Sequence, residues 1–323
     1  MTKIEAIWLE ERGKAESKPV AQDELRLTRI DPVSPLDIYA GVSDSLLVVL
    51  AVGVSTRPPA MALQSGALDY FRRRRADGSW LMVLRLKLRE LEQVFGRLCQ
   101  DLIEATTLVQ TQEELVALMV ARLKLWEMLF SGTQDGLLGI NQIRGLVAEL
   151  LALEDILASG RRGVADAVEG WVGPSRADRD FEYSDMSLEV KSLSPGRRGV
   201  TIASLEQLDS AGPLVLVVAT LPSAGKTDAG SFCLNTLVGR LEEKVSPDPL
   251  ALALFKEKLI LAGYVEHPRY EADWFVITDL RSFDVTEGFP RLVVGKVPEG
   301  ILSASYEIEL ALLSVFERKG SLA

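Results

Sequence analysis

The residues best suited to chemistry lie in one segment of the chain, residues 179–191. Glu189 and Lys191 stand two positions apart in Ser187–Leu193, a predicted strand in which they alternate with Leu188 and Val190, and Asp180 precedes them on another predicted strand. Alternate side chains of a strand share a face, so Glu189 and Lys191 point to the same side. A hairpin between the two strands places Asp180 across from Glu189. Two carboxylates and one amine are therefore expected to meet at one point.

This combination of groups suits the hydrolysis of a phosphodiester. That reaction needs a divalent cation that draws charge from the phosphate and lowers the pKa of a bound water. Mg²⁺ prefers oxygen ligands and keeps several waters, so two carboxylates together with substrate oxygens suit it, and Mn²⁺ is the alternative ion. An ammonium group beside the water positions it and stabilises the developing charge. The competing interpretation is a surface hairpin that carries ordinary charges.

The histidine content narrows the chemistry further, because His267 is the only histidine of the chain. A zinc site with two His ligands cannot form within one chain. A Ser-His-Asp or Cys-His arrangement would need His267 itself, which stands in the turn-like stretch Glu266–Arg269. The carboxylate and lysine set works without histidine and remains the leading candidate.

The same residues resemble a known signature. Asp180 followed by Glu189-Val190-Lys191 is similar to the Asp…(Asp/Glu)-x-Lys pattern of the PD-(D/E)XK nuclease superfamily, with Arg179 where the superfamily has Pro. From about residue 20 to about residue 315, the chain resembles a prokaryotic PD-(D/E)XK family of unknown function that is found near restriction and phage-defence genes. The motifs that carry this resemblance are Arg144–Leu150, Trp171–Pro174, Arg179–Phe181, Leu188–Ser192 and Ser204–Leu208.

The resemblance implies a role for each candidate residue. Asp180 and Glu189 are expected to bind Mg²⁺, and Lys191 is expected to orient the attacking water. Glu149 matches the acidic residue that the first core helix often contributes to the metal site. Gln207 matches a Gln that some members carry near the site on the following helix.

Two of these assignments have rivals nearby. Asp178, Asp180 and Glu182 share strand parity, so each is able to face the metal, and Asp180 is preferred because a Phe follows it as in the family pattern. Glu154 competes with Glu149 on the same predicted helix. Glu149 is preferred because it fits the Gly-x-x-x-Glu-Leu spacing.

The balance of charge bears on DNA binding. Lys and Arg number 36 against 46 Asp and Glu, which gives a net charge of -10, so DNA binding requires a local basic patch. Arg72–Arg75 is either a phosphate-binding run or a solvated strand end. Trp171 is expected to pack in the core, with stacking on a base as the alternative. Arginines in or beside loops around the proposed site predict a phosphate-binding rim, formed by Arg161, Arg162, Arg176, Arg179, Arg197 and Arg198.

Hydrophobic periodicity predicts an α/β protein. Residues 1–105 are expected to form a β-rich N-terminal domain, residues 106–135 a helical connector and residues 136–323 a nuclease-like domain. Within the last of these, the order is helix, hairpin, helix at Thr201–Ser210 and buried strand at Pro213–Thr220. This order predicts a mixed central sheet flanked by helices. The resemblance implies that this core has the fold of a restriction endonuclease.

Composition indicates the cellular setting. Hydrophobic residues make up 47% of the 323 residues, which is enough to bury a full core. Cys99 and Cys233 are expected to be buried thiols in a reducing compartment. The longest apolar run, Leu46–Val54, is too short to span a bilayer, and the first residues lack the apolar core of a signal peptide. We therefore expect a soluble cytoplasmic protein without a membrane partner.

Two hypotheses from different classes follow. The first is a Mg²⁺-dependent DNA endonuclease of restriction or phage-defence type. It is expected to act as a homodimer or beside partner proteins of a defence operon, because a single site cuts one strand. The second is a non-catalytic DNA-binding or scaffold subunit of a defence complex, with a fold inherited from nucleases. A cleavage assay with Mg²⁺ or Mn²⁺ separates the two.

Overall fold

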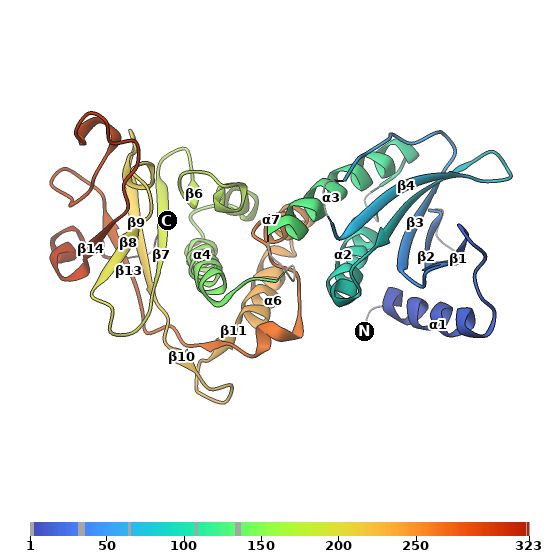
Figure 1. The fold of residues 1–323 in the computed structure, drawn as a ribbon. Coiled ribbons are helices and arrows are strands. Elements are labelled where there is room, and N and C mark those ends of the chain that lie inside the picture. The colour runs from blue at the N-terminus through green and yellow to red at the C-terminus, as the bar shows by residue number, and fades with distance from the viewer. Residues whose placement is uncertain are drawn as a thin grey trace. The chain divides into compact units, whose positions relative to one another are not determined.

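The structure, a computed structural model, describes residues 3–31, 36–63, 66–106, 109–132, 137–320 and 322. The chain divides into two compact units (Figure 1). The N-terminal unit contains Met1–Leu137 and Gly263–Glu266, and the C-terminal unit contains Leu138–Ala262 and His267–Ala323.

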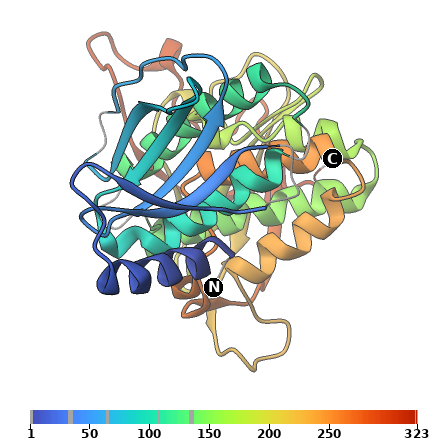
Figure 2. The ribbon, with the colours of Figure 1, turned by 90° about the vertical axis from the view of Figure 1, so that its right-hand side faces the viewer.

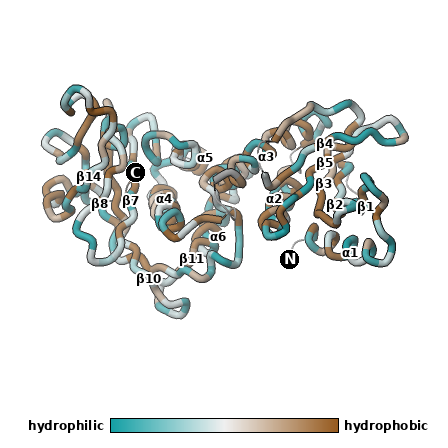
Figure 3. Tube along the Cα trace, in the orientation of Figure 1, coloured by the Kyte–Doolittle hydropathy of each residue, from teal (hydrophilic) through white to brown (hydrophobic). Residues whose placement is uncertain are grey.

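An antiparallel sheet in the order β1-β2-β3-β5-β4 forms the body of the N-terminal unit. Its strands are β1 Leu25–Arg29, β2 Ile38–Ser43, β3 Val48–Val54, β4 Leu68–Arg74 and β5 Trp80–Leu86. All residues of β3 are buried, which its uninterrupted apolar sequence explains. Apolar segments, drawn in brown, follow β3 and β5 in Figure 3.

Helices complete the core of this unit. Trp8 stacks on Phe95 with ring centroids 5.4 Å apart, and the Trp8 indole Nε1 donates a hydrogen bond to the carbonyl of Val49 at 3.0 Å. The first helix lies along the sheet beside β2 (Figure 2). The helical elements are α1 Lys3–Ser17, η1 Arg89–Leu91, α2 Glu92–Ala105 and α3 Gln112–Gly132.

A mixed sheet in the order β13-β9-β7-β6 forms the centre of the C-terminal unit. Strand β7 runs parallel to β9, whereas β6 and β13 are antiparallel to their neighbours. Residues 214–219 of β9 are buried, as predicted from its continuous apolar run. The strands are β6 Phe181–Glu182, β7 Ser187–Leu193, β9 Leu214–Thr220 and β13 Asp279–Asp284.

Helix α4 packs against β7 and β9, and further helices pack on α4. The helices are α4 Ile140–Ser159, α5 Val164–Glu169, α6 Leu234–Val245 and α7 Pro249–Leu261. The short 3-10 turns are η3 Gly173–Ser175, η4 Glu206–Leu208, η5 Pro268–Glu271, η6 Val294–Lys296 and η7 Leu310–Phe316. The remaining strands are β8 Gly199–Ile202, β10 Ser223–Ala224, β11 Phe232–Cys233, β12 Trp274–Phe275 and β14 Tyr306–Glu309.

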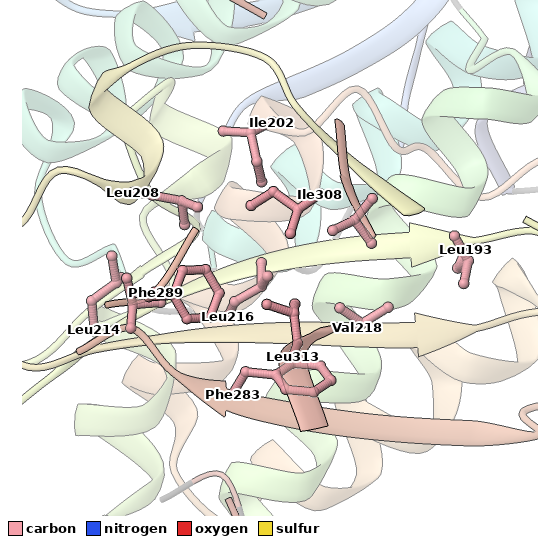
Figure 4. Packing of buried hydrophobic residues seen from close by; sticks show 12 residues of the cluster. Leu193, Ile202, Leu208, Leu214, Leu216, Val218, Phe283, Phe289, Ile308 and Leu313 are labelled. Carbon is pink, nitrogen blue, oxygen red and sulfur yellow. The ribbon is translucent and has the colours of Figure 1, made fainter. Parts of the chain in front are cut away.

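A cluster of buried apolar side chains joins this sheet to the ribbon formed by β8 and β14 (Figure 4). Leu216 and Val218 of β9 and Phe283 of β13 contribute from the sheet. Ile202 of β8 and Ile308 of β14 contribute from the ribbon. Burial of this cluster holds β8 and η4 beside β7, where the candidate residues lie.

The mixed α/β class is as predicted, but the helix predicted at Thr201–Ser210 is wrong. Strand β8 occupies Gly199–Ile202 and pairs with β14, and only the short turn η4 follows at Glu206–Leu208. Pairing with a distant strand outweighs the local helical pattern. Among the described residues, every helix falls short of the length and apolar character of a membrane span.

Candidate active site

The hairpin of β6 and β7 brings Asp180 to Glu189. Phe181 pairs with Leu188 in this antiparallel ladder, so Asp180, one residue earlier, lies level with Glu189, one residue later. The Asp180 carboxylate Oδ2 accepts a hydrogen bond from the backbone N–H of Val190 at 2.7 Å. The first predicted acid is therefore attached directly to the strand that carries the other two groups.

A cleft of about 440 Å³ opens beside this hairpin. Residues of α4, β7, β8 and η4 contribute to its walls. Each of the residues predicted to be catalytic lines this cleft: Glu149, Asp180, Glu189, Lys191 and Gln207. Residues far apart in the sequence thus meet at one place.

Glu189 is the most deeply buried acid of the cleft, with 1% of its surface exposed. The ammonium Nζ of Lys191 lies 2.5 Å from Glu189 Oε1 and forms an ion pair with it. Apart from this lysine, neither carboxylate oxygen of Glu189 has a hydrogen-bond donor among the described residues. Buried polar atoms without a hydrogen-bond partner are rare in proteins, and a bound ion or water is one of the explanations for them.

Gln207 fixes the position of the lysine. The side-chain Oε1 of Gln207 accepts a hydrogen bond from Lys191 Nζ at 3.2 Å and another from the backbone N–H of Ala203 at 2.8 Å. Lys191 therefore bridges Glu189 on its own strand and Gln207 on η4. This arrangement holds the ammonium group at the wall of the cleft.

Glu149 joins the site from α4. Its carboxylate Oε2 accepts a hydrogen bond from the indole Nε1 of Trp171 at 2.8 Å. Trp171 is fully buried, so stacking on a base is wrong and core packing is right for this residue. The rival Glu154 is absent from the cleft lining and pairs instead with Arg240 and Lys244, at 2.9 Å and 2.8 Å.

The rivals of Asp180 also lie elsewhere. Asp178 and Glu182 are exposed and do not line the cleft. Glu182 is within 3.4 Å of Arg179 NH1, in an ion pair at the surface. The family pattern therefore selected the acid that faces the cleft.

The backbone approaches the acids closely at Gly173. A Cβ atom added there would lie 2.9 Å from Glu149 Oε2 and 3.0 Å from Asp180 Oδ1. The two carboxylate oxygens therefore face one common point above this glycine. A side chain at residue 173 would occupy the space that they share.

Burial and mutual repulsion disturb the titration of these acids. Burial, reinforced by the nearby charge of Asp180, raises the pKa of Glu149 and the pKa of Glu189 to about 8 each. Burial also raises the pKa of Asp180 above its ordinary value. Such clustering of acids with raised pKa values is typical of catalytic centres and of sites that take a cation.

The donor set fits a hard divalent cation. Carboxylate oxygens from Glu149, Asp180 and Glu189 are the ligands that Mg²⁺ prefers, and within the described part of the chain Lys191 is the one donor close to the Glu189 oxygens. In the same described residues, no group of three or more His, Cys, Asp or Glu side chains is already gathered in metal-binding geometry. Binding of a cation by all three acids would therefore require their side chains to move.

Two arginines line the cleft. Arg197 was part of the predicted rim and is exposed, whereas Arg144 was not assigned to it. The Arg144 guanidinium donates to the carbonyl of Leu221 at 2.5 Å and to Ser223 Oγ at 3.0 Å, and lies over the ring of Phe275. A guanidinium has five N–H donors, so these contacts leave some for a ligand.

The other arginines of the predicted rim lie outside the lining of the cleft. Arg162 pairs with Asp185 and lies over the ring of Tyr183, 3.8 Å from its centroid. Arg179 donates to a backbone carbonyl at 2.8 Å, in addition to its surface ion pair. The remaining three arginines of the predicted rim have exposed side chains: Arg161, Arg176 and Arg198.

Sequence reasoning assigned no role to Gly173 or Lys258. Gly173 lies inside the motif Trp171–Pro174, so the motif itself was a signal. Lys258 is 8% exposed and lies in α7, one position before Leu259 and three after Phe255, both of which are buried. Such a buried lysine is unusual and would have been a signal for a specific contact.

Comparison with known proteins identifies a family. A family model described as "Putative PD-(D/E)XK family member, (DUF4420)" matches residues 4–311. No curated protein and no solved structure gives a significant match. The matched range includes all of the residues that line the cleft.

Proposed function

Because the chain belongs to this PD-(D/E)XK family, we propose that its cleft hydrolyses phosphodiester bonds of DNA in a Mg²⁺-dependent reaction. One observation carries the proposal. Glu149, Asp180, Glu189 and Lys191 line a single cleft, and within the described residues the oxygens of the buried Glu189 have no partner other than the lysine. The acids are able to hold the divalent cation that such hydrolysis uses, and the amine is able to stabilise the charge that develops.

The carboxylates of Asp180, Glu189 and Glu149 would hold the Mg²⁺ ion, or Mn²⁺ in its place. Bound there, the ion would draw charge from the phosphate and lower the pKa of a bound water. The backbone N–H of Val190 keeps Asp180 aimed at the cleft. The indole of Trp171 does the same for Glu149.

Lys191 is the residue that would orient the attacking water. Its ammonium group lies at the cleft wall between Glu189 and Gln207, so it is close to the carboxylates without being enclosed by them. The positive charge also stabilises the negative charge that develops on the phosphate. Gln207 limits the movement of this flexible side chain through the hydrogen bond to Lys191 Nζ.

Arg144 and Arg197 would contact the phosphates on either side of the bond that is cut. Both line the cleft, where the acids would otherwise repel a polyanion. In a protein with a net charge of -10, such local positive charge is what allows DNA to approach. Arg161, Arg162, Arg176, Arg179 and Arg198 remain proposals for the outer parts of the DNA contact.

The wider role that we propose is a cytoplasmic restriction or phage-defence endonuclease with a restriction-endonuclease-like core. A single site cuts one strand, so we propose a homodimer or an assembly with partner proteins of a defence operon. In this proposal the N-terminal domain, residues 1–105, recognises DNA or mediates assembly. Residues 106–135 connect it to the nuclease-like domain, residues 136–323, which cuts the DNA.

The experiment is a cleavage assay with the full chain on supercoiled plasmid, linear duplex, single-stranded DNA and RNA. Each substrate is incubated with Mg²⁺, with Mn²⁺ and with EDTA. The proposal predicts cleavage of DNA that requires the metal. If no nucleic acid is cut while DNA binding is retained, the proposal fails in favour of a non-catalytic DNA-binding or scaffold subunit.

A further inference from the structure

A buried lysine on α7 holds the segment that carries Trp171. Lys258 is 8% exposed, and its ammonium Nζ donates to the backbone carbonyls of Val168 at 2.9 Å, Glu169 at 2.8 Å and Trp171 at 2.5 Å. An ammonium group has three N–H donors, so all of them are used. The three acceptors lie at the C-terminal end of α5 and just beyond it.

The contact between Lys258 and the three carbonyls requires burial of a charged group, which costs free energy. Burial disfavours the charged form and lowers the pKa of Lys258 to about 8. Among the described residues, no carboxylate forms an ion pair or hydrogen bond with Lys258, and its partners are backbone carbonyls at the negative end of a helix. An apolar side chain at this position would avoid the cost of desolvating a charge. What the lysine adds is its three hydrogen bonds, which fix the positions of the three carbonyls.

Helix α7 holds Trp171 at two points. Lys258 binds its carbonyl, and Phe255, three residues earlier on α7, packs against its indole with ring centroids 5.9 Å apart. The indole N–H then points at Glu149 Oε2, 2.8 Å away. Trp171 also forms a β-bridge with Phe181, the residue that follows the cleft acid on the chain.

We propose that Lys258 is a positioning residue of the active site, which acts through Trp171 to aim the carboxylate of Glu149 into the cleft. This inference rests on the proposed function, because that function gives Glu149 its role as a metal ligand. The contacts from Lys258 through Trp171 to Glu149 do not depend on it. Lys258 lies outside the lining of the cleft, so it has no part in the chemistry itself. Residues that support a metal ligand in this indirect way commonly change metal affinity or activity about 10–100-fold when they are removed.

The first test is a double-mutant cycle on the full chain. Lys258→Met removes the donors and keeps the length, and Trp171→Phe removes the indole N–H and keeps a ring. Each variant is expected to lower Mn²⁺ affinity, measured by titration calorimetry, by about 10–100-fold. The double variant is expected to resemble the weaker-binding single variant, because both act on one chain of contacts. Effects that multiply independently would overturn the proposal.

The second test monitors the hydrogen bond between the Trp171 indole and Glu149 directly, without metal binding or cleavage activity. In a nitrogen-15 NMR spectrum, the Trp171 indole N–H signal is assigned by its absence in Trp171→Phe. The proposal predicts that this signal moves in Lys258→Met as well as in Glu149→Gln. Lys258→Arg keeps the charge and the N–H donors, so its Mn²⁺ affinity is expected to lie between that of Lys258→Met and that of the wild type. This variant replaces Lys258→Met in both tests if the Met variant does not fold.

The control is Lys244→Met, which removes a partly exposed lysine of the same unit that pairs with Glu154 on α4. It is expected to leave the indole signal and the Mn²⁺ affinity unchanged. An indole signal that stays in place in Lys258→Met overturns the positioning role, even if the enzyme cuts DNA. An absence of Mn²⁺ binding in the wild type, with the indole signal still responding to Lys258→Met, would instead count against the proposed function.

Discussion

Asp180 and Val190 are joined by a hydrogen bond of 2.7 Å from the Val190 backbone N–H to the Asp180 carboxylate. Val190 stands between Glu189 and Lys191 on β7, so this bond relates the first acid of the site to the other two groups directly. One oxygen of Asp180 is used in this way. The other faces the point above Gly173 that Glu149 also faces.

Replacement of Asp180 by Asn keeps the size of the side chain and removes its charge. We expect the cleavage rate to fall by about 100-fold or more, since charge stabilisation by a metal site is worth several kcal/mol. Stability should change little, because an amide oxygen still accepts from Val190. Single-turnover cleavage together with urea unfolding measures the two effects. An active Asp180→Asn protein would show that the metal lies elsewhere.

Gly173→Ala adds a methyl group where the two acids face each other. The contacts of 2.9 Å and 3.0 Å are too short, so the carboxylates must move apart. We expect a strong loss of Mn²⁺ binding and a stability loss of about 1–3 kcal/mol, as for overpacked sites. Gly239→Ala on α6, which meets nothing within 4 Å, is the matched control and should gain about 0.5–1 kcal/mol. Equal Mn²⁺ affinities in the two variants would contradict this interpretation.

The metal-free protein should lose stability as pH rises from about 5 to about 8. The folded pKa values of Glu149 and Glu189 are raised from 4.5 to about 8, so in this window the folded state binds more protons than the unfolded state. Its stability therefore falls with pH. Urea unfolding in EDTA at several pH values measures this slope. Glu149→Gln and Glu189→Gln should each flatten it, and an identical slope in all three proteins would refute the assignment.

Arg197 and Arg198 offer a matched pair for DNA binding. They are adjacent and both exposed, but only Arg197 lines the cleft. Arg197→Ala should weaken binding to all duplex sequences alike and reduce the salt slope of the affinity by about 1. Arg198→Ala should have the smaller effect. Fluorescence anisotropy at several salt concentrations, with Ca²⁺ in place of Mg²⁺, separates them, and a larger effect for Arg198 would contradict the proposed path of DNA.

The central residues could be predicted because they obey local rules. Alternation along a strand puts Glu189 and Lys191 on one face, and a short turn brings Asp180 level with Glu189. The choice of Glu149 over Glu154 came from the family spacing, because both lie on one helix and periodicity alone does not separate them. The structure agrees, since Glu154 is occupied by two basic side chains.

The remaining parts depend on contacts between distant segments. Lys258 binds carbonyls that lie 87 to 90 residues earlier in the chain, which no local pattern reveals. Arg162 pairs with Asp185, which lies 23 residues later in the turn between β6 and β7. The helix predicted at Thr201–Ser210 does not form, because β8 pairs with β14, a strand near the end of the chain. Tertiary pairing decides such cases.

The most direct test of the account is the Mg²⁺-dependent cleavage of duplex DNA by the wild type beside Lys191→Met and Glu189→Gln. All three proteins are compared at equal folded concentration, with Lys244→Met as the control. We predict that the wild type and the control cut DNA, and that the two cleft variants are slower by about 100-fold or more. Cleavage by Lys191→Met and Glu189→Gln at the wild-type rate would contradict the assignment of this cleft as the active site.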